Sequence, residues 1–268
     1  MYDLHCHILP AFDDGAKDID TALAMARIAV DDGITHLACT PHIYPGLFEN
    51  NTQGIKSALE TFSSELDRAA ISLELSIGAD IQIIPELLGS LQNGAMPTIN
   101  GSRYFLLEPP HHIPSPHIEQ MVFDVVAAGY VPIVTHPERL EWLDDHYDTF
   151  LSLADHGAWM QLTSGSITGR FGDGPKYWSE KMLDDGIVYL IATDAHNMTS
   201  RAPLLAEGAE AAARWVGQKE ARALVYDRPK AVWKNQEIST ISLPPAYNEN
   251  GKLRQKPKKR FFKRMFGR

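Results

Sequence analysis

Histidine and acidic residues recur along this chain at spacings that suit metal binding. His5 and His7 stand two residues apart in DLHCH, and Asp194 and His196 repeat the spacing in TDAH. Side chains two residues apart on a β-strand point to the same face. Imidazoles mixed with carboxylates suit Zn, Mn or Fe, whereas all-oxygen sites suit Mg or Ca. Alone, one such pair is more often a packing or hydrogen-bonding feature than a metal site.

Further histidine and acidic residues follow the other predicted strands. They are Asp14, His42, Asp80, Glu108 and His136. In barrels of parallel strands, functional residues gather at the carboxyl ends of the strands. A rim of acids and histidines without metal would repel itself and cost stability, so packing does not explain the coincidence. Five histidines and four acids exceed the needs of one ion, which predicts two or three divalent ions.

These residues need strands to position them. Short apolar runs alternate with amphipathic helical segments, which predicts an α/β protein with parallel strands. The predicted strands centre on Asp3, Leu37, Ile77, Leu106, Ile133, Leu162 and Leu190. Seven strand–helix units, about 25 to 40 residues apart, favour a closed or nearly closed barrel over an open sheet. The first strand is not followed by a Gly-rich phosphate loop, which disfavours a dinucleotide-binding fold.

Helical periodicity separates the predicted strands. Asp18 or Asp20 is predicted to cap the first helix, and Gly33 to close it. Its apolar face consists of Ala22, Met25, Ala26 and Ala29, and the next helix carries Ile55, Leu59, Phe62 and Leu66. Later helices are predicted at 117–128, 142–156, 176–184, 203–214 and 218–226.

Composition limits the class of protein. The 268 residues, 44% hydrophobic and 22% charged, are typical of a globular protein with a substantial core. The only two cysteines, Cys6 and Cys39, exclude a disulfide framework, and no apolar run approaches the roughly 20 residues of a membrane-spanning helix. The first residues, MYDLHCHILP, do not resemble a secretory signal. A cytoplasmic location is therefore expected.

Charge divides the chain into an acidic body and a basic tail. Of the 25 Lys/Arg residues, nine lie in 251–268 with no acid among them, which leaves 16 basic and 34 acidic residues, or −18, in 1–250. We predict one domain over 1–238, then a linker containing ISLPPAYNENGKL and a basic tail over 239–268. In a helix, residues 252–268 would place Phe261, Phe262, Met265 and Phe266 on one side. That pattern favours docking at the anionic inner face of the cell membrane, with a solubilising tail or general attraction to polyanions as alternatives.

Several motifs together resemble a known family. DLHCHILPAFDDGAKD, TPHIYPGLFEN, GADIQI, LLEPP, THPER and ATDAHNMTSR are similar, in order and spacing, to motifs of the CpsB/CapC family of capsule-associated, PHP-type metal-dependent protein tyrosine phosphatases. The resemblance spans about residues 1–235. It implies a distorted seven-stranded (β/α)7 TIM-like barrel with a trinuclear site, most often described with Mn, with Fe or Zn as alternatives.

The resemblance also implies a ligand set for each ion. The first ion would be held by His5, His7, Asp80 and Asp194, and the second by Asp80, Glu108 and His136. The third would be held by Asp14, His42 and His196. Family members usually have Glu where this chain has Asp80, and the shorter side chain changes how two ions can be bridged.

Phosphotyrosine hydrolysis is the reaction that the resemblance implies. The partner would be a phosphotyrosine-bearing protein, a membrane tyrosine autokinase that regulates capsule or exopolysaccharide synthesis. Arg139 and Arg201 follow ligand motifs and would bind the phosphate, the alternative being surface salt bridges. Neither cysteine is followed after five residues by Arg, which disfavours cysteine catalysis. His111, His112 and His117 are predicted to lie in a solvated loop.

Other functions remain open at this stage. A PHP phosphatase for a small ester such as histidinol phosphate would use the same ligands. A metal-dependent amidohydrolase would usually need Lys at a middle strand, where this chain has Glu108. A weakly catalytic, membrane-recruited regulatory module is the non-enzymatic alternative, favoured by Asp80. No specific nucleic-acid partner is expected, and the sequence leaves self-association open.

Overall fold

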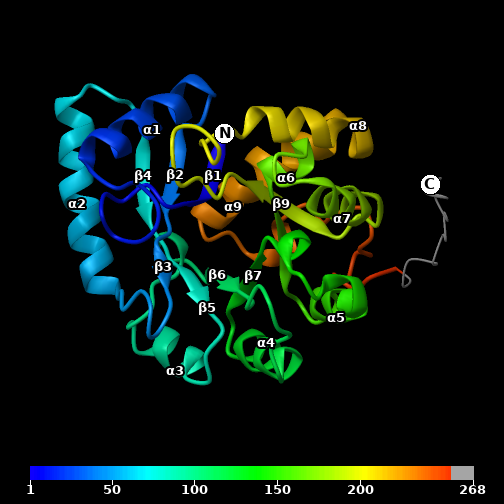
Figure 1. Cartoon of the computed structure of the whole chain (residues 1–268). Coiled ribbons are helices and arrows are strands. Elements are labelled where there is room, and N and C mark those ends of the chain that lie inside the picture. The colour runs from blue at the N-terminus through cyan, green and yellow to red at the C-terminus, as the bar shows by residue number, and fades with distance from the viewer. Residues whose placement is uncertain (255–268) are drawn as a thin grey trace.

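Residues 1–254 are described by the computed structural model, and helices surround the strands in it (Figure 1). The strands are β1 (Tyr2–Cys6), β2 (His36–Cys39), β3 (His42–Ile43), β4 (Glu74–Ile77), β5 (Asp80–Gln82), β6 (Tyr104–Glu108), β7 (Val131–Thr135), β8 (Trp159–Thr163) and β9 (Val188–Ala192). The α-helices are α1 (Ile19–Asp31), α2 (Thr52–Arg68), α3 (Leu87–Gln92), α4 (Ile118–Ala127), α5 (Leu143–Asp155), α6 (Ser164–Thr168), α7 (Asp173–Asp184), α8 (Ala206–Arg222) and α9 (Arg228–Trp233). A π-helical turn, Ala223–Asp227, joins α8 to α9, and short 3-10 turns lie at Ile99–Gly101, Pro137–Arg139 and Ile238–Thr240.

All the strand pairs in this part of the chain are parallel. One sheet has the order β1-β2-β4, and the other has the order β3-β5-β6-β7-β8-β9. Beyond the ladders, β1 meets the segment after β9, because the His7 N–H donates to Ala195 O at 2.9 Å and the Asp194 N–H donates to His5 O at 2.8 Å. The predicted α/β class with parallel strands is confirmed.

Each of the seven predicted strand centres lies in a strand, but residues 1–254 contain nine strands. The second and third predicted strands are each followed by a short separate strand, β3 and β5. Pro41, which has no N–H to donate, stands between β2 and β3, and Gly78 and Ala79 stand between β4 and β5. Both β3 and β5 begin at a predicted ligand, His42 and Asp80 respectively.

The predicted helices have close counterparts. Asp18 caps α1 by accepting from the Thr21 N–H, and Gly33 follows the helix with φ of +90°. Gly217 has non-helical dihedral angles inside α8, so the break predicted between 214 and 218 is present as a kink. Sequence periodicity did not predict α3, α6 or α9, which have five or six residues each.

The strands are buried on both faces. Every residue of β1, β6, β7, β8 and β9 is buried, as expected for parallel strands covered by helices. No helix in the described part of the chain combines the length and the apolar character that crossing a membrane requires.

Residues 241–254, which belong to the predicted linker, pack against the body. Arg228 is fully buried in α9, and its Nε donates to Ser242 O at 2.7 Å. The Tyr247 ring lies edge-on to Tyr189, with centroids 5.2 Å apart. The Leu253 N–H donates to Asp155 Oδ1 at 3.1 Å, at the end of α5. This segment therefore lies near the amino ends of β8 and β9. Of the predicted basic tail, 255–268 lie outside the described residues.

Candidate metal centre and phosphate site

His5 and His7 face one another from the carboxyl end of β1. Both side chains are fully buried, and their Nε2 atoms lie 3.1 Å apart. Asp194, from the segment after β9, brings Oδ1 within 3.3 Å of His5 Nε2 and 3.4 Å of His7 Nε2. Asp194 has φ of +49°, a left-handed conformation that non-glycine residues adopt at some energetic cost. The predicted same-face arrangement of the two histidines is therefore present.

Two residues fix the orientation of these imidazoles. His5 Nδ1 lies 2.8 Å from Gln161 Oε1 on β8, and His7 Nδ1 lies 2.7 Å from Asp13 Oδ2. An acceptor at Nδ1 keeps a proton on that nitrogen, so Nε2 is the nitrogen that can bind a metal ion, as in many metal sites. Both Nε2 atoms are thereby directed at the same small space.

Asp80 is a central carboxylate of the cluster. Its Oδ1 accepts from Thr135 Oγ1 at 3.2 Å. Its Oδ2 lies 3.3 Å from His5 Nε2, 3.8 Å from His42 Nδ1 and 3.7 Å from His136 Nε2. Only one oxygen of this short side chain therefore faces the other predicted ligands.

Glu108 and His136 come next along the rim. Glu108 Oε1 lies 3.8 Å from His136 Nε2, and Glu108 Oε2 lies 3.3 Å from His42 Nδ1. His136 has φ of +34°, so a second ligand-bearing residue adopts a left-handed conformation. His111 also belongs here, because its Nε2 lies 3.7 Å from Glu108 Oε1. The prediction that His111 lies in a solvated loop is wrong, since its side chain is only 30% exposed and faces the cluster.

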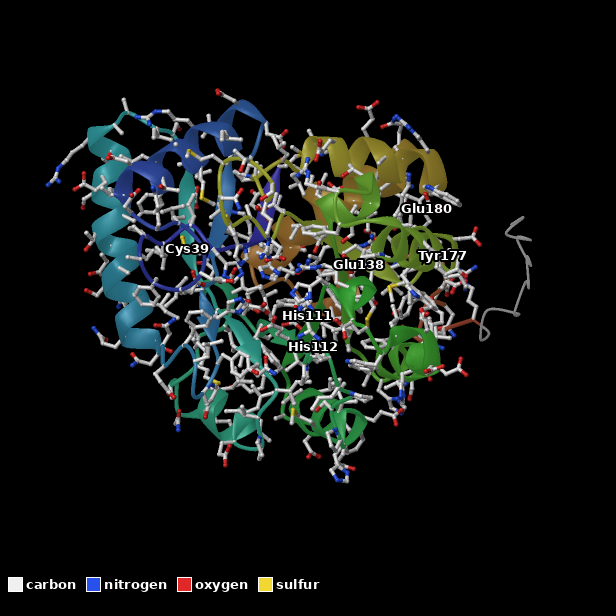
Figure 2. The ribbon with its side chains drawn as sticks, in the orientation of Figure 1. Cys39, His111, His112, Glu138, Tyr177 and Glu180 are labelled. Atoms are coloured by element: carbon white, nitrogen blue, oxygen red, sulfur yellow. The ribbon has the colours of Figure 1, made fainter. Side chains whose placement is uncertain are left out.

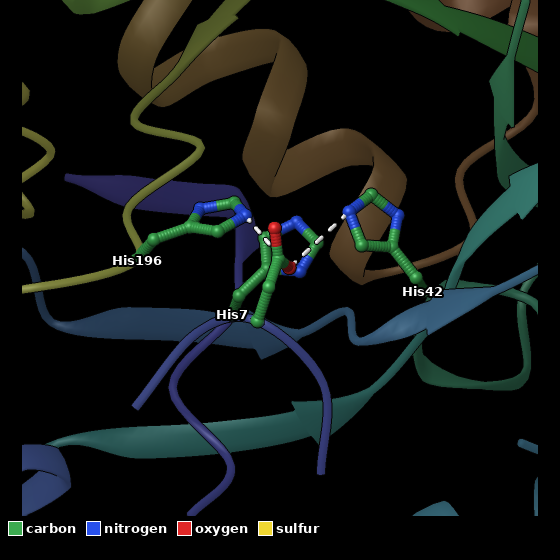
Figure 3. A group of neighbouring side chains, drawn as sticks. His7, His42 and His196 are labelled. Carbon is green, nitrogen blue, oxygen red and sulfur yellow. Dashed lines mark ion pairs between the residues drawn. The ribbon is translucent and has the colours of Figure 1, made fainter. Parts of the chain in front are cut away.

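The third predicted group also assembles. Asp14 Oδ1 lies 3.6 Å from His42 Nε2 and 3.3 Å from His196 Nε2. Figure 3 shows His42 and His196 approaching from opposite sides, with His7 between them. One potential ligand atom from each of His7, Asp14, His42 and His196 lies within 4.8 Å of the others. All nine predicted ligands therefore lie in one continuous cluster. His42 and Asp80 come from the starts of β3 and β5, and the others come from the carboxyl ends of strands or from the segments that follow them.

The histidines differ in charge. Burial would lower the pKa of His5, but the charges of Asp80 and Asp194 raise it to about 9. Burial also opposes protonation of His42, but the nearby Glu108 carboxylate raises its pKa to about 10. Without metal, both imidazoles are protonated at neutral pH.

His136 and His196 are shifted in the opposite direction. Burial lowers the pKa of His136 to about 4, although Asp80 opposes the shift. Burial and the nearby His7 lower the pKa of His196 to about 4. These two imidazoles are neutral at pH 7 and can bind a cation without losing a proton.

The donor set fits divalent ions. His42 Nδ1, Asp80 Oδ2 and His196 Nε2 are buried without a hydrogen-bond partner, an arrangement that costs stability unless something else satisfies them. Ligand atoms about 2.1 Å from one ion stand about 3.0 to 3.4 Å apart in octahedral or tetrahedral geometry. The separations of 3.3 to 3.8 Å around Asp80 Oδ2 are close to these values. Mixed nitrogen and oxygen donors suit Mn, Fe or Zn.

Arg139 and Arg201 both reach the cluster and pair with Asp194 Oδ2, Arg201 at 2.6 Å. Burial would raise the pKa of Asp194, but Arg201 and His5 hold it well below the ordinary range. Glu138, labelled in Figure 2, accepts from the Thr163 N–H at 2.8 Å and so fixes the turn that carries Arg139. The two arginines are therefore neither isolated nor part of distant surface salt bridges.

Cysteine chemistry is disfavoured by burial. Cys6 and Cys39 are fully buried, and burial raises the pKa of both thiols above the ordinary value. A protonated, enclosed thiol is a poor nucleophile.

Comparison with known proteins agrees with this geometry. A family model described as "Capsular polysaccharide synthesis, CpsB/CapC" matches residues 1–234. The chain belongs to the CpsB/CapC family. It is 35% identical over 202 residues to tyrosine-protein phosphatase YwqE of Bacillus subtilis, covering 75% of this chain and 79% of YwqE. It is 27% identical over 243 residues to tyrosine-protein phosphatase CpsB of Streptococcus pneumoniae, covering 89% of this chain and all of CpsB.

Solved structures give the same result for this CpsB/CapC protein. A structure titled as YwqE from B. subtilis and CpsB from S. pneumoniae, "unique metal-dependent tyrosine phosphatases", superposes with a TM-score of 0.85 at 32% identity. It covers 89% of this chain and 96% of that one. A β-aspartyl dipeptidase of Fervidobacterium islandicum has a TM-score of 0.52 at 15% identity over 87% of this chain and 72% of its own, which shows a shared fold alone.

Sequence reasoning missed three residues of the site. Gln161 orients His5, Asp13 orients His7, and His111 faces Glu108. Gln161 was detectable, because it is the one amide in a fully buried strand, WMQLT. Asp13 adjoins Asp14 and His111 adjoins His112, so the sequence did not show which member of each pair faces the site.

Proposed function

We propose that this protein is a metal-dependent protein tyrosine phosphatase that hydrolyses phosphotyrosine in capsule or exopolysaccharide synthesis. The observation that carries the proposal is that nine histidine and acidic side chains and two arginines converge in one cluster, at the side of the molecule that we call the mouth. The named relatives of the chain are tyrosine phosphatases. Mn is the proposed metal, with Fe or Zn as alternatives, because the donor set mixes imidazoles with carboxylates.

The residues divide between holding metal and holding phosphate. His5, His7, Asp80 and Asp194 would hold one ion, Asp80, Glu108 and His136 a second, and Asp14, His42 and His196 a third. When bound, the ions lower the pKa of a water and polarise phosphoryl oxygens. Water attacks phosphorus in line with the tyrosine oxygen. The bond between phosphorus and the tyrosine oxygen breaks as the new P–O bond forms, which yields inorganic phosphate and tyrosine. The leaving phenol has a pKa near 10, so the protein needs only modest help to protonate it.

Arg139 and Arg201 are proposed to stabilise the phosphoryl group. A guanidinium fork matches two phosphate oxygens, and both forks are already positioned beside the ligands by Asp194 Oδ2. Phosphate binding would replace part of this pairing without moving either arginine far. Arg139 is further positioned by Phe171, whose ring centroid lies 4.6 Å from the guanidinium carbon.

The loops around the mouth favour a protein substrate over a small ester. Tyr44 and Leu47 follow His42 and are 39% and 63% exposed. Ile113 follows Glu108 and is 65% exposed, and Met198 follows His196 and is 43% exposed. Exposed apolar side chains on ligand-bearing loops offer contact area to residues that flank a phosphotyrosine. A small ester has no atoms to cover them.

A finer description of the fold follows from the site. We propose that β2 and β3 together form one interrupted strand of a seven-stranded barrel, and that β4 and β5 together form another. The Gly78 N–H donates to Cys39 O at 3.0 Å and the Asp80 N–H donates to Pro41 O at 3.2 Å, which supports continuity across both interruptions.

Membrane docking through residues 252–268 is proposed from charge and position. Arg254 is attached to the body, since its N–H donates to Ala246 O at 2.8 Å. This attachment lies near the amino ends of β8 and β9, whereas the ligands lie at the carboxyl ends. A tail on the anionic inner face of the membrane would leave the mouth directed away from the lipid, toward a phosphorylated segment of a membrane tyrosine kinase. Cosedimentation with vesicles containing anionic lipid should be lost when the chain ends at Arg254, and equal binding would refute the proposal.

Parallel assays test the catalytic proposal. A phosphotyrosine peptide should be hydrolysed with a higher kcat/KM than histidinol phosphate, and chelation should abolish both activities. The Arg139→Met variant should lose about 10² to 10³ in kcat/KM, the usual effect of removing one donor to transition-state charge. Arg103→Met is the matched control, because Arg103 pairs with Glu237 instead of a site residue. Preference for the small ester, or an equal loss in both variants, would contradict the proposal.

A further inference from the structure

His111 has an environment unlike that of its neighbour His112 (Figure 2). His111 Nε2 and His136 Nε2 lie 3.7 and 3.8 Å from the same oxygen, Glu108 Oε1. One ligand atom from each of these three residues lies within 4.8 Å of the other two. His112 is 78% exposed and pairs with Glu141, with 3.1 Å between Nδ1 and Oε1. The two adjacent histidines therefore differ in direction and partner.

The loop holds His111 in this direction. The Trp142 indole N–H donates to Pro110 O at 2.8 Å, and the Glu141 N–H donates to His111 O at 3.1 Å. Pro109 and Pro110 restrict the backbone just before His111. The main-chain carbonyls of Pro110 and His111 are therefore both held by hydrogen bonds. Because the loop is already ordered, little conformational entropy is lost when the imidazole binds an ion.

Counting donors shows what His111 adds. Besides Glu108 Oε1, the other inferred ligand atoms of this ion are His136 Nε2, at 3.8 Å from that oxygen, and Asp80 Oδ2, at 3.7 Å from His136 Nε2. Asp80 Oδ2 also faces His5 and His42, while Asp80 Oδ1 accepts from Thr135, so Asp80 gives this position only a shared oxygen. Three donors, one of them shared, leave at least one coordination position of a divalent ion open. An imidazole from His111 brings the number to four.

We propose that His111 is a further ligand of the ion held by Glu108 and His136. This inference rests on the proposed metal-dependent function and adds a residue to it. A second imidazole at this ion shifts its preference from Mg toward Mn, Fe or Zn.

Metal binding without substrate tests the role of His111. Metal-stripped wild-type, His111→Ala, His111→Asp and His112→Ala proteins would be titrated with Mn or Co, with bound metal counted by mass spectrometry and Co followed by visible absorption. The expected result is that His111→Ala binds one class of ion at least about 10-fold more weakly and alters the Co spectrum, as with loss of residues that support a metal site. His111→Asp keeps a donor and should recover most of the affinity, and His112→Ala should match wild type.

The outcomes separate the two proposals. Wild-type protein that binds no divalent ion would refute the metal-dependent function itself. Wild-type protein that binds metal, together with a His111→Ala variant of unchanged stoichiometry, affinity and Co spectrum, would overturn the role of His111 alone. Circular dichroism of each metal-stripped variant checks that the fold is intact, and His111→Phe, which also has no donor, carries the test if His111→Ala does not fold.

Discussion

Removing the Gln161 amide should weaken metal binding without touching a ligand. Gln161 Oε1 lies 2.8 Å from His5 Nδ1, and both side chains are fully buried. A Gln161→Leu substitution keeps a similar volume but leaves Nδ1 without an acceptor. Leaving a buried polar group unpaired costs about 1 to 3 kcal/mol, which is a factor of about 5 to 150 in an equilibrium constant. We expect the first ion to bind more weakly by that factor.

Competition with a chromophoric chelator for Mn measures this effect. Gln161→Glu retains an acceptor and should bind Mn at least as tightly as wild type, because a carboxylate raises the basicity of His5. Gln120→Leu is the matched surface control, since Gln120 also makes a 2.8 Å side-chain hydrogen bond, to Asp124, but far from the site. Wild-type affinity in Gln161→Leu, or equal weakening in the Leu and Glu variants, would refute the reasoning.

Three further predictions follow from charge, space and burial. Because their pKa values are about 9 and 10, His5 and His42 must lose protons when metal binds at pH 7, so metal affinity should rise with pH. Calorimetry of metal binding in two buffers should detect the release of about two protons. Release of no protons would contradict this prediction. A Cβ at Gly15 would lie 2.0 Å from His7 O, so Gly15→Ala should lower the free energy of unfolding by about 1 to 3 kcal/mol in urea, and unchanged stability would count against it. Arg228→Met removes the ion pair with Glu220 and the hydrogen bond to Ser242 O. It should lower the free energy of unfolding by about 3 to 5 kcal/mol and expose residues 241–254 to proteolysis. Resistance to proteolysis equal to that of wild type would show that other contacts hold this segment.

Much of the site could be predicted because strand geometry imposes it. His5 and His7 lie two residues apart in a strand, so their shared face follows from the backbone alone. Parallel strands end at one mouth, so Asp80, Glu108 and His136 could be grouped before their distances were known. The predicted strand centres succeeded for the same reason, since buried parallel strands form continuous apolar runs.

The remainder depends on contacts that spacing does not encode. Gln161 lies 156 residues from His5 in the chain, and only the tertiary fold brings them together. The direction of His111 is set by the hydrogen bond between Trp142 and Pro110, which involves residues 32 apart. The packing of the predicted linker depends on Arg228, whose burial no local pattern indicates.

The most direct test of metal-dependent phosphotyrosine hydrolysis is the rate of phosphate release from a phosphotyrosine peptide during metal removal and return. The stripped protein should be inactive and should regain activity as Mn is added back. A variant carrying His5→Ala and His7→Ala, with circular dichroism like that of wild type, should stay inactive at every Mn concentration. Hydrolysis that persists in the stripped protein, or in the folded double variant, would contradict the account.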